Sequence, residues 1–258
     1  MPEPSFVLVH GGAHGAWCWE PLLPHLSGSA LAVDLPPKSV RGIRAEHATP
    51  PPELLTVGLD DFASSVIADV DAAGLDRFVL VGHSMGGLTV PEVARRIPDR
   101  VEHLVFVSCL IPPDGGSIIE ALPDVHRDTV RRSVADAVAG EAGAVMGQFD
   151  DDMTRQMFCN DMDDEQTEFV LAHTGLEAPL AFADPVTRAG IPPELPKTYV
   201  RLARDQALAP DDQERQIAAL RDSPGGELRI VDLDTAHDVM ISAPELLAGV
   251  LNELAARP

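Results

Sequence analysis

The segment Phe78-Val79-Leu80-Val81-Gly82-His83-Ser84-Met85-Gly86-Gly87 carries the strongest indication of the fold. It opens with a short apolar run, which is typical of a strand that is buried on both faces. The motif G-x-S-x-G follows directly, and the pattern from Leu88 to Ile97 predicts that a helix comes next. In such a strand–turn–helix unit the serine hydroxyl projects above the end of a sheet from a strained turn. We therefore expect Ser84 to be a nucleophile.

Short apolar runs elsewhere in the chain predict five more strands. These runs are residues 6–9, 30–33, 104–107, 198–202 and 228–231. Helical patterns occupy residues 57–73, the stretch from Ser84 to Pro98, and about 211–221 and 243–256. Because strands and helices alternate, we expect an α/β fold with a mostly parallel sheet of about six strands and helices on both faces.

Residues 110–186 interrupt this alternation, because they hold helical patches but no good strand candidate. The long apolar side chains of this stretch include Met146, Phe149, Met153, Met157 and Phe158. We expect a core formed by residues 1–109 and 187–258, with residues 110–186 inserted as a helical lid. Flexible Met and aromatic side chains suit an apolar lid over a cleft. Ordinary packing between helices would use the same residues, so the sequence leaves both roles open.

Composition excludes several classes of function. The chain has 258 residues, of which 45% are hydrophobic, so one large α/β domain is expected rather than a disordered chain. Lys and Arg number 19 and Asp and Glu number 41, which gives a formal net charge of −22. Such a charge repels nucleic acid and anionic lipid, so neither is expected as a partner. The lysines are Lys38 and Lys197 alone, which with the abundant Ala suggests a GC-rich bacterial genome.

The cysteines favour a reducing compartment. Cys18, Cys109 and Cys159 are odd in number and form no C-x-x-C motif, so neither a disulfide framework nor a structural zinc site is expected. A strand-like run begins at Phe6, which leaves no room for a signal peptide. No apolar stretch approaches the roughly 18 residues of a membrane span. We therefore expect a cytoplasmic protein.

A serine nucleophile needs a base, and His237 is the histidine in the best position. It lies in the loop between the last predicted strand and the final helix, which in this architecture meets the sheet edge beside Ser84. His10 and His14 belong to the first loop, and the side chain of His83 is expected to point away on the turn. The other histidines are expected at the surface or in the core: His25, His47, His103, His126 and His173.

The base needs a carboxylate that fixes its tautomer, and Asp205 follows the fifth predicted strand. The chain order Ser84, Asp205, His237 is the order expected for this kind of serine motif. Other acids near the site are less well placed. The rivals are Asp211, Asp212, Asp232, Asp234 and Asp238. Asp211 and Asp212 look like first-turn helix acids, whereas Asp232 and Asp234 lie close to His237 in sequence but on its own strand end.

The oxyanion of an acyl-transfer reaction needs backbone N–H donors. One is expected from Met85, which follows the nucleophile, and the other from Gly12 in the Gly-rich loop after the first strand. That loop does not match G-x-G-x-x-G or the Walker A motif, so a nucleotide cofactor is not expected. His10 and His14 are four positions apart but do not form H-E-x-x-H, so no metal is expected either.

Four stretches together resemble the plant methyl esterase and hydroxynitrile lyase group of α/β-hydrolases, and bacterial esterases of the pyrethroid-hydrolase type are similar. They are His10–Trp19, Gly82–Gly87, Tyr199–Asp205 with Pro210 and Gln213, and Ala236–Met240 leading to Pro244. The resemblance covers residues 5–109 and 197–256 and is weak across the expected lid. It implies the α/β-hydrolase fold and the roles already given to Ser84, Asp205 and His237.

The resemblance also helps to distinguish ester hydrolysis from the hydroxynitrile lyase reaction. The lyases of that group are expected to carry Thr after the first-strand histidine and Lys after the catalytic histidine. This chain has Gly11 and Asp238 at those positions, so hydrolysis is favoured. We expect cleavage of a small to medium lipophilic carboxylic ester through an acyl-enzyme, with no cofactor and with a homodimer as an open option. A hydroxynitrile lyase, a tailoring enzyme acting on a lactone, thioester or C–C bond, and a non-catalytic small-molecule binding protein remain alternatives.

Overall fold

Six parallel strands form one sheet in the order β2-β1-β3-β4-β5-β6. This is a computed structural model that describes residues 4–141, 146–147 and 149–256. Residues 1–3, 142–145, 148, 257 and 258 fall inside the predicted boundaries but lie outside the described residues. The strands are β1 (Ser5–Val9), β2 (Ser29–Val33), β3 (Phe78–His83), β4 (Val101–Val107), β5 (Lys197–Leu202) and β6 (Leu228–Leu233). All six predicted strands are confirmed.

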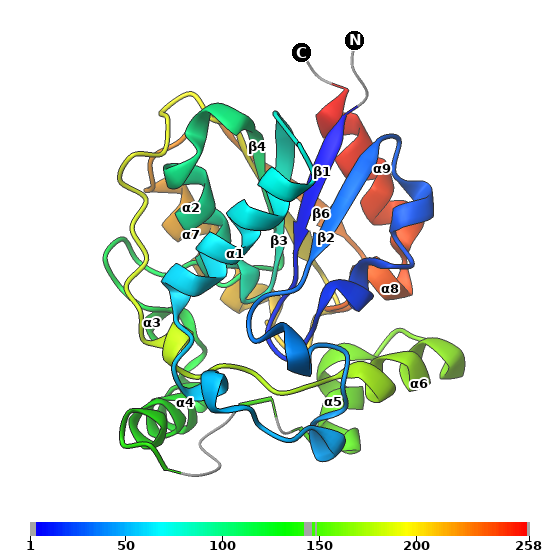
Figure 1. Cartoon of the computed structure of the whole chain (residues 1–258). Helices are drawn as coiled ribbons and strands as arrows, with labels where there is room; N and C mark the ends of the chain where they lie inside the picture. The colour runs from blue at the N-terminus through cyan, green and yellow to red at the C-terminus, as the bar shows by residue number, and fades with distance from the viewer. Residues whose placement is uncertain (1–3, 142–145, 148, 257–258) are drawn as a thin grey trace.

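The sheet is buried on both faces, as the continuous apolar runs predict. Alternate residues of the fully buried β3 join opposite core clusters: Phe78 and Leu80 join one, and Val79 and Val81 the other. The first cluster also holds side chains of α1 (Leu59–Ala72), α2 (Gly86–Arg96) and α7 (Pro210–Arg221). The second holds side chains of α8 (Val239–Ser242) and α9 (Pro244–Ala255), which cover the other face (Figure 1).

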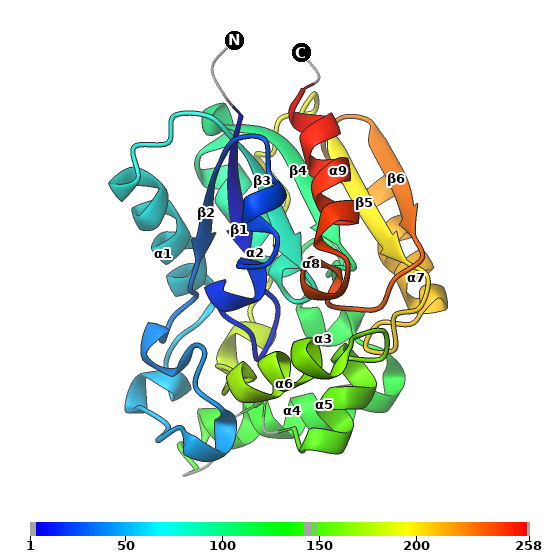
Figure 2. The same cartoon turned by 90° about the vertical axis from the view of Figure 1, so that its right-hand side faces the viewer.

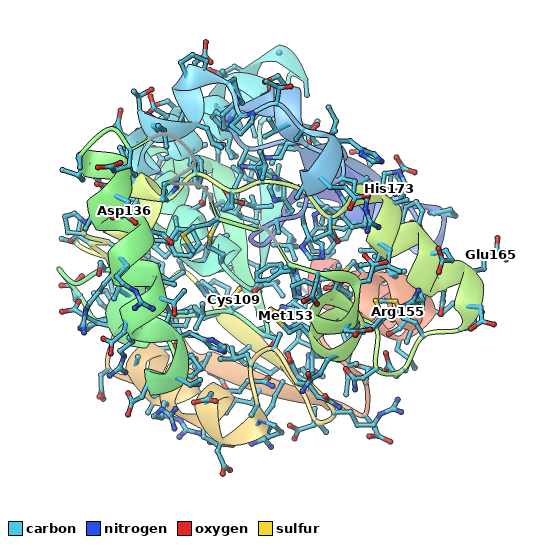
Figure 3. The ribbon with its side chains drawn as sticks, turned by 90° about the horizontal axis from the view of Figure 1, so that it is seen from below. Cys109, Asp136, Met153, Arg155, Glu165 and His173 are labelled. Atoms are coloured by element: carbon cyan, nitrogen blue, oxygen red, sulfur yellow. The ribbon has the colours of Figure 1, made fainter. Side chains whose placement is uncertain are left out.

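The segment between β4 and β5, residues 108–196, holds four more α-helices in its described part. They are α3 (Ile118–Ala121), α4 (Asp124–Val138), α5 (Asp151–Phe158) and α6 (Asp164–His173). These helices gather beyond the carboxyl end of the sheet, at the opposite end from both termini (Figure 2). Seen from that end, α4 with Asp136 lies on one side, and α5 with Met153 and α6 with Glu165 lie on the other (Figure 3). None of the described helices is long and apolar enough to span a membrane.

Candidate active site

Ser84 occupies a strained turn directly after β3. Its φ is +51°, in the left-handed region that residues other than glycine rarely adopt. Neighbouring backbone holds the turn, because Ser84 N–H donates to the Val107 carbonyl over 3.0 Å and its own carbonyl accepts from Leu110 N–H over 3.1 Å. The half-buried residue therefore has the strained backbone that the G-x-S-x-G motif predicts.

Two glycines allow the backbone to close around this turn. A Cβ on Gly82 would lie 2.7 Å from Val90 Cγ2 of α2, and a Cβ on Gly11 would lie 2.7 Å from Ser84 Cβ. Both separations are shorter than carbon atoms tolerate, so any larger residue would displace its neighbours. The glycines thus permit the close strand–helix packing and the close approach of the first loop to Ser84.

Asp205 and His237 are joined by a hydrogen bond of 2.6 Å from His237 Nδ1 to Asp205 Oδ2. The same oxygen accepts a 2.6 Å hydrogen bond from Ser108 Oγ, and Oδ1 accepts from the N–H groups of Ala207 and Leu208 at 2.8 Å. Four donors thus fix a buried carboxylate. Because Asp205 occupies Nδ1, the nitrogen of His237 left for another partner is Nε2.

The surroundings of His237 adjust its pKa in opposite directions. Burial lowers it, but the charge and hydrogen bond of Asp205, followed by the charge of Asp238, raise the pKa above the usual histidine value. The ring of His83 lies next to that of His237, with a distance of 4.5 Å between the two ring centroids. Its Nε2 donates to the His237 carbonyl over 3.1 Å, while burial and then the charge of His237 hold its pKa well below the usual value. His83 is therefore a neutral ring, and its hydrogen bond holds the main chain of His237.

Ser84 and His237 line the same cavity, whose volume is about 430 Å³. Within the described residues no hydrogen bond joins the two side chains, so the shared cavity is what links them. Catalytic hydrogen bonds are often long or poorly aligned when no substrate is bound. All five long apolar side chains predicted for the lid also line this cavity: Met146, Phe149, Met153, Met157 and Phe158.

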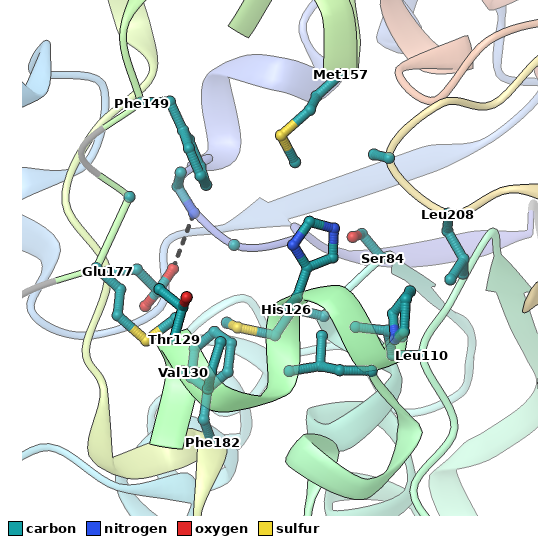
Figure 4. A pocket seen from close by; sticks show the side chains of 18 of the residues that line it. Ser84, Leu110, His126, Thr129, Val130, Phe149, Met157, Glu177, Phe182 and Leu208 are labelled. Atoms are coloured by element: carbon teal, nitrogen blue, oxygen red, sulfur yellow. Dashed lines mark hydrogen bonds between the residues drawn. The ribbon is translucent and has the colours of Figure 1, made fainter. Parts of the chain in front are cut away.

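Gly12 and Met85 line the cavity beside Ser84. Across the described part of the chain, neither the Gly12 N–H nor the Met85 N–H has a hydrogen-bond acceptor. The adjacent Ala13 N–H is engaged, since it donates to Glu177 Oε2 over 3.1 Å (Figure 4). Both N–H groups expected to bind an oxyanion are therefore free in the described structure, unlike that of Ala13.

Three residues at the site were missed in the sequence. Ser108 follows β4, and the carboxyl ends of adjacent strands β4 and β5 could have indicated its contact with Asp205. His126 was expected at the surface or in the core; it is exposed, but it also lines the cavity from α4 (Figure 4). Glu177 lines the cavity wall and is paired with Arg41, at 2.9 Å from Arg41 Nη1 to Glu177 Oε2. No local pattern marks His126 or Glu177.

Among the residues that the structure describes, one group of side chains lies close enough to hold a metal ion: His83, His237 and Asp238, whose ligand atoms lie within 4.8 Å of one another. Two of the ring nitrogens in this group are already engaged: His237 Nδ1 with Asp205, and His83 Nε2 with the His237 carbonyl. Asp238 Oδ2 pairs in turn with His14, so the three side chains belong to a hydrogen-bonded array that reaches the cavity at His237.

A family model described as "Alpha/beta hydrolase family" matches residues 6–250. The chain belongs to the alpha/beta hydrolase family. Among curated relatives, the "Carbendazim hydrolyzing esterase" of Nocardioides sp. (strain SG-4G) is 34% identical over 46% of this chain and 47% of that protein. "Methylesterase 9" of Arabidopsis thaliana is 36% identical over 42% of this chain and 40% of that protein. The match thus spans less than half the length of each of these relatives.

Solved structures resemble this chain along almost its whole length. An extracellular alpha/beta-hydrolase from a Paenibacillus species has a TM-score of 0.78 at 20% identity and covers 98% of this chain and 100% of its own. Polyneuridine aldehyde esterase has a TM-score of 0.73 at 19% identity and covers 98% of this chain and 99% of its own. At such identities the likeness shows the fold alone.

Proposed function

We propose that this hydrolase cleaves a small to medium lipophilic carboxylic ester through an acyl-enzyme on Ser84. The observation that carries the proposal is that a serine on a strained turn and a histidine anchored to a buried carboxylate line one cavity. The curated relatives named as esterases support the reaction class. The apolar side chains of α5 and its flanks support a lipophilic substrate, with residues 110–186 acting as the lid.

Each residue has a defined task in this mechanism. His237 Nε2 takes the proton of Ser84 Oγ as that oxygen attacks the ester carbonyl carbon, and Asp205 stabilises the imidazolium that forms. The N–H groups of Gly12 and Met85 donate to the oxyanion of the tetrahedral intermediate. The C–O bond to the alcohol then breaks, and the alcohol leaves with the proton from His237. Water, deprotonated by His237, attacks the acyl carbonyl and releases the acid and Ser84.

Two positions argue against the lyase alternative. A Cβ at position 11 would lie 2.7 Å from Ser84 Cβ, so the threonine expected in the lyases does not fit this backbone. Asp238, where those lyases are expected to carry lysine, is buried and paired with His14 at 2.9 Å. A carboxylate at this position offers no cation to a departing cyanide.

The mechanism is tested by labelling the protein with a fluorophosphonate and by following hydrolysis of an aryl acetate. Wild-type protein should be labelled at Ser84 and turn over the ester, whereas Ser84→Ala should lose both. Ser65→Ala is the matched control, because Ser65 lies on α1 and does not line the cavity. Full turnover by Ser84→Ala would exclude the acyl-enzyme. Parallel assays with lactones, thioesters and a cyanohydrin separate the other reactions, and ligand binding without turnover would indicate a binding protein.

A further inference from the structure

A second buried histidine–carboxylate pair lies beside the proposed catalytic residues. His14 Nε2 and Asp238 Oδ2 are 2.9 Å apart, and the side chains are 1% and 0% exposed. The residues are 224 positions apart in the chain. His14 belongs to the loop that contains Gly12, and Asp238 directly follows His237. The mechanism proposed above gives neither side chain a task.

Both ring nitrogens of His14 face acceptors. Nδ1 lies 2.8 Å from the Gly12 carbonyl, and Nε2 faces Asp238. Burial raises the pKa of Asp238, but the neighbouring histidines, first among them His14 through its charge and hydrogen bond, lower it below the usual value. Asp238 is therefore ionised, and the two oxygens that the His14 nitrogens face suit a ring that donates through both nitrogens. Its ring stacks on Trp17 at a centroid distance of 5.1 Å, a geometry that favours a cation.

The His14–Asp238 pair connects the two loops that the reaction must bring together. On one side, His14 Nδ1 holds the carbonyl of Gly12, whose N–H is an oxyanion donor in the proposed mechanism. On the other side, Asp238 is bonded through the main chain to His237. The Arg41 guanidinium further fixes this loop, since Nη1 donates to the His14 carbonyl over 3.3 Å. Movement of either partner would shift Gly12 relative to His237.

We propose that the His14–Asp238 ion pair sets the relative position of the oxyanion loop and the histidine loop, and that both residues are positioning residues for ester hydrolysis. The inference rests on the proposed function. Asp238 also acts on His237 electrostatically, because its charge is one of those that raise the pKa of His237. The other groups that face Asp238 are His83, which is neutral, and the thiols of Cys18 and Cys159, whose pKa values burial raises.

A double-mutant cycle with His14→Gln, Asp238→Asn and the double variant tests the pair. Each single variant leaves a buried partner without its counter-charge, so we expect kcat to fall about tenfold to a hundredfold with KM within about threefold. The melting temperature should fall by roughly 10 °C in each single variant and should recover in part in the double variant. In Asp238→Asn the acid limb of kcat/KM should also move to lower pH, which a purely structural role would not cause.

His25→Gln is the matched control, because His25 is exposed and its Nδ1 lies 3.9 Å from Oε1 of the exposed Glu245. Additive losses of stability in the double variant, or an unmoved acid limb in Asp238→Asn, would overturn the inference. The charge state is tested without ester turnover by ¹⁵N NMR of the histidine rings. At a pH well above about 6.5, two protonated nitrogens in His14 support the pair and one protonated nitrogen rejects it. Failure of ester turnover in the wild type would reject the proposed function alone, since this NMR result does not depend on it.

Discussion

Asp205 and His237 are 32 positions apart in the chain, yet one carboxylate oxygen of Asp205 lies 2.6 Å from His237 Nδ1. Ser108 Oγ donates to the same oxygen over 2.6 Å. Two side-chain donors converging on one oxygen fix the direction from which Asp205 meets the imidazole. The orientation of the proposed base therefore depends on the ends of both β4 and β5.

Ser108→Ala removes one of these donors and leaves the backbone donors from Ala207 and Leu208. Because a hydrogen bond to a charged group contributes about 1.5–3 kcal/mol, we expect kcat/KM to fall roughly tenfold to a hundredfold. Asp205→Asn should cost more, about 10⁴-fold in kcat, since it no longer selects the correct tautomer of His237. Steady-state kinetics on an aryl ester measure both effects. Wild-type rates in Ser108→Ala would mean that the backbone donors alone hold the carboxylate.

The pH dependence of hydrolysis follows from the raised pKa of His237. His237 must be neutral to accept the proton of Ser84, so activity is lost as the pH falls through its pKa. We expect the acid limb of kcat/KM to have its midpoint above about 6.5, the ordinary value for histidine. A kcat/KM profile for an aryl ester, corrected for unfolding at each pH, measures this midpoint. A midpoint below the ordinary value would contradict the dominance of the Asp205 and Asp238 charges over burial.

Gly11→Ala introduces a methyl group 2.7 Å from Ser84 Cβ and 3.2 Å from the His83 carbonyl. Because these neighbours belong to the strained turn, we expect the turn to move and kcat to fall about a hundredfold. Gly249→Ala on α9 is the control, since its added methyl group would have open space within 4 Å. That control should keep its activity and gain up to about 1 kcal/mol of stability. Equal activity in the two variants would show that the first loop can move away from Ser84 without loss of activity.

The sequence predicts those features that depend on local pattern. Apolar runs located all six strands, and the glycines and Ser84 of the elbow located the strained turn. Strand order then brings the loops after β3, β5 and β6 to one edge, which is why Asp205 and His237 could be proposed from their loops alone.

Side-chain partners that depend on loop geometry could not be predicted. Asp238 is one of the rivals to Asp205 in the sequence, but its carboxylate pairs with His14 instead of orienting His237. Ser108 and Asp205 are 97 positions apart, and no sequence motif includes both residues. The contacts between the β4–β5 segment and the core could not be predicted either, because they depend on how the helices of residues 108–196 pack.

The turn between α5 and α6 contacts both loops that carry the proposed acid and base. Asp161 Oδ2 accepts a 2.7 Å hydrogen bond from the N–H of Ala236, which precedes His237. Asn160 Nδ2 donates over 2.9 Å to the carbonyl of Arg204, which precedes Asp205. We expect Asp161→Ala to lower kcat about tenfold by loosening the histidine loop. The exposed first-turn acid of α5 supplies the control Asp152→Ala, and equal kinetics in the two variants would argue against this coupling.

His126 lines the cavity from α4 together with Thr129 and Ser133, at spacings that place the three on one helix face (Figure 4). This polar face is set in an otherwise mainly apolar lining, so it should recognise a hydrogen-bonding group of the substrate. We expect His126→Leu to raise KM about threefold to tenfold for an ester that carries a hydroxyl, because one hydrogen bond contributes about 0.5–1.5 kcal/mol. The KM for the matching ester without the hydroxyl should not rise. Pairs of aryl esters that differ by one hydroxyl, on the acyl side or on the leaving group, make this comparison, with the exposed His47→Leu as control. If KM were unchanged in both pairs, the polar face of α4 would serve solvation rather than substrate choice.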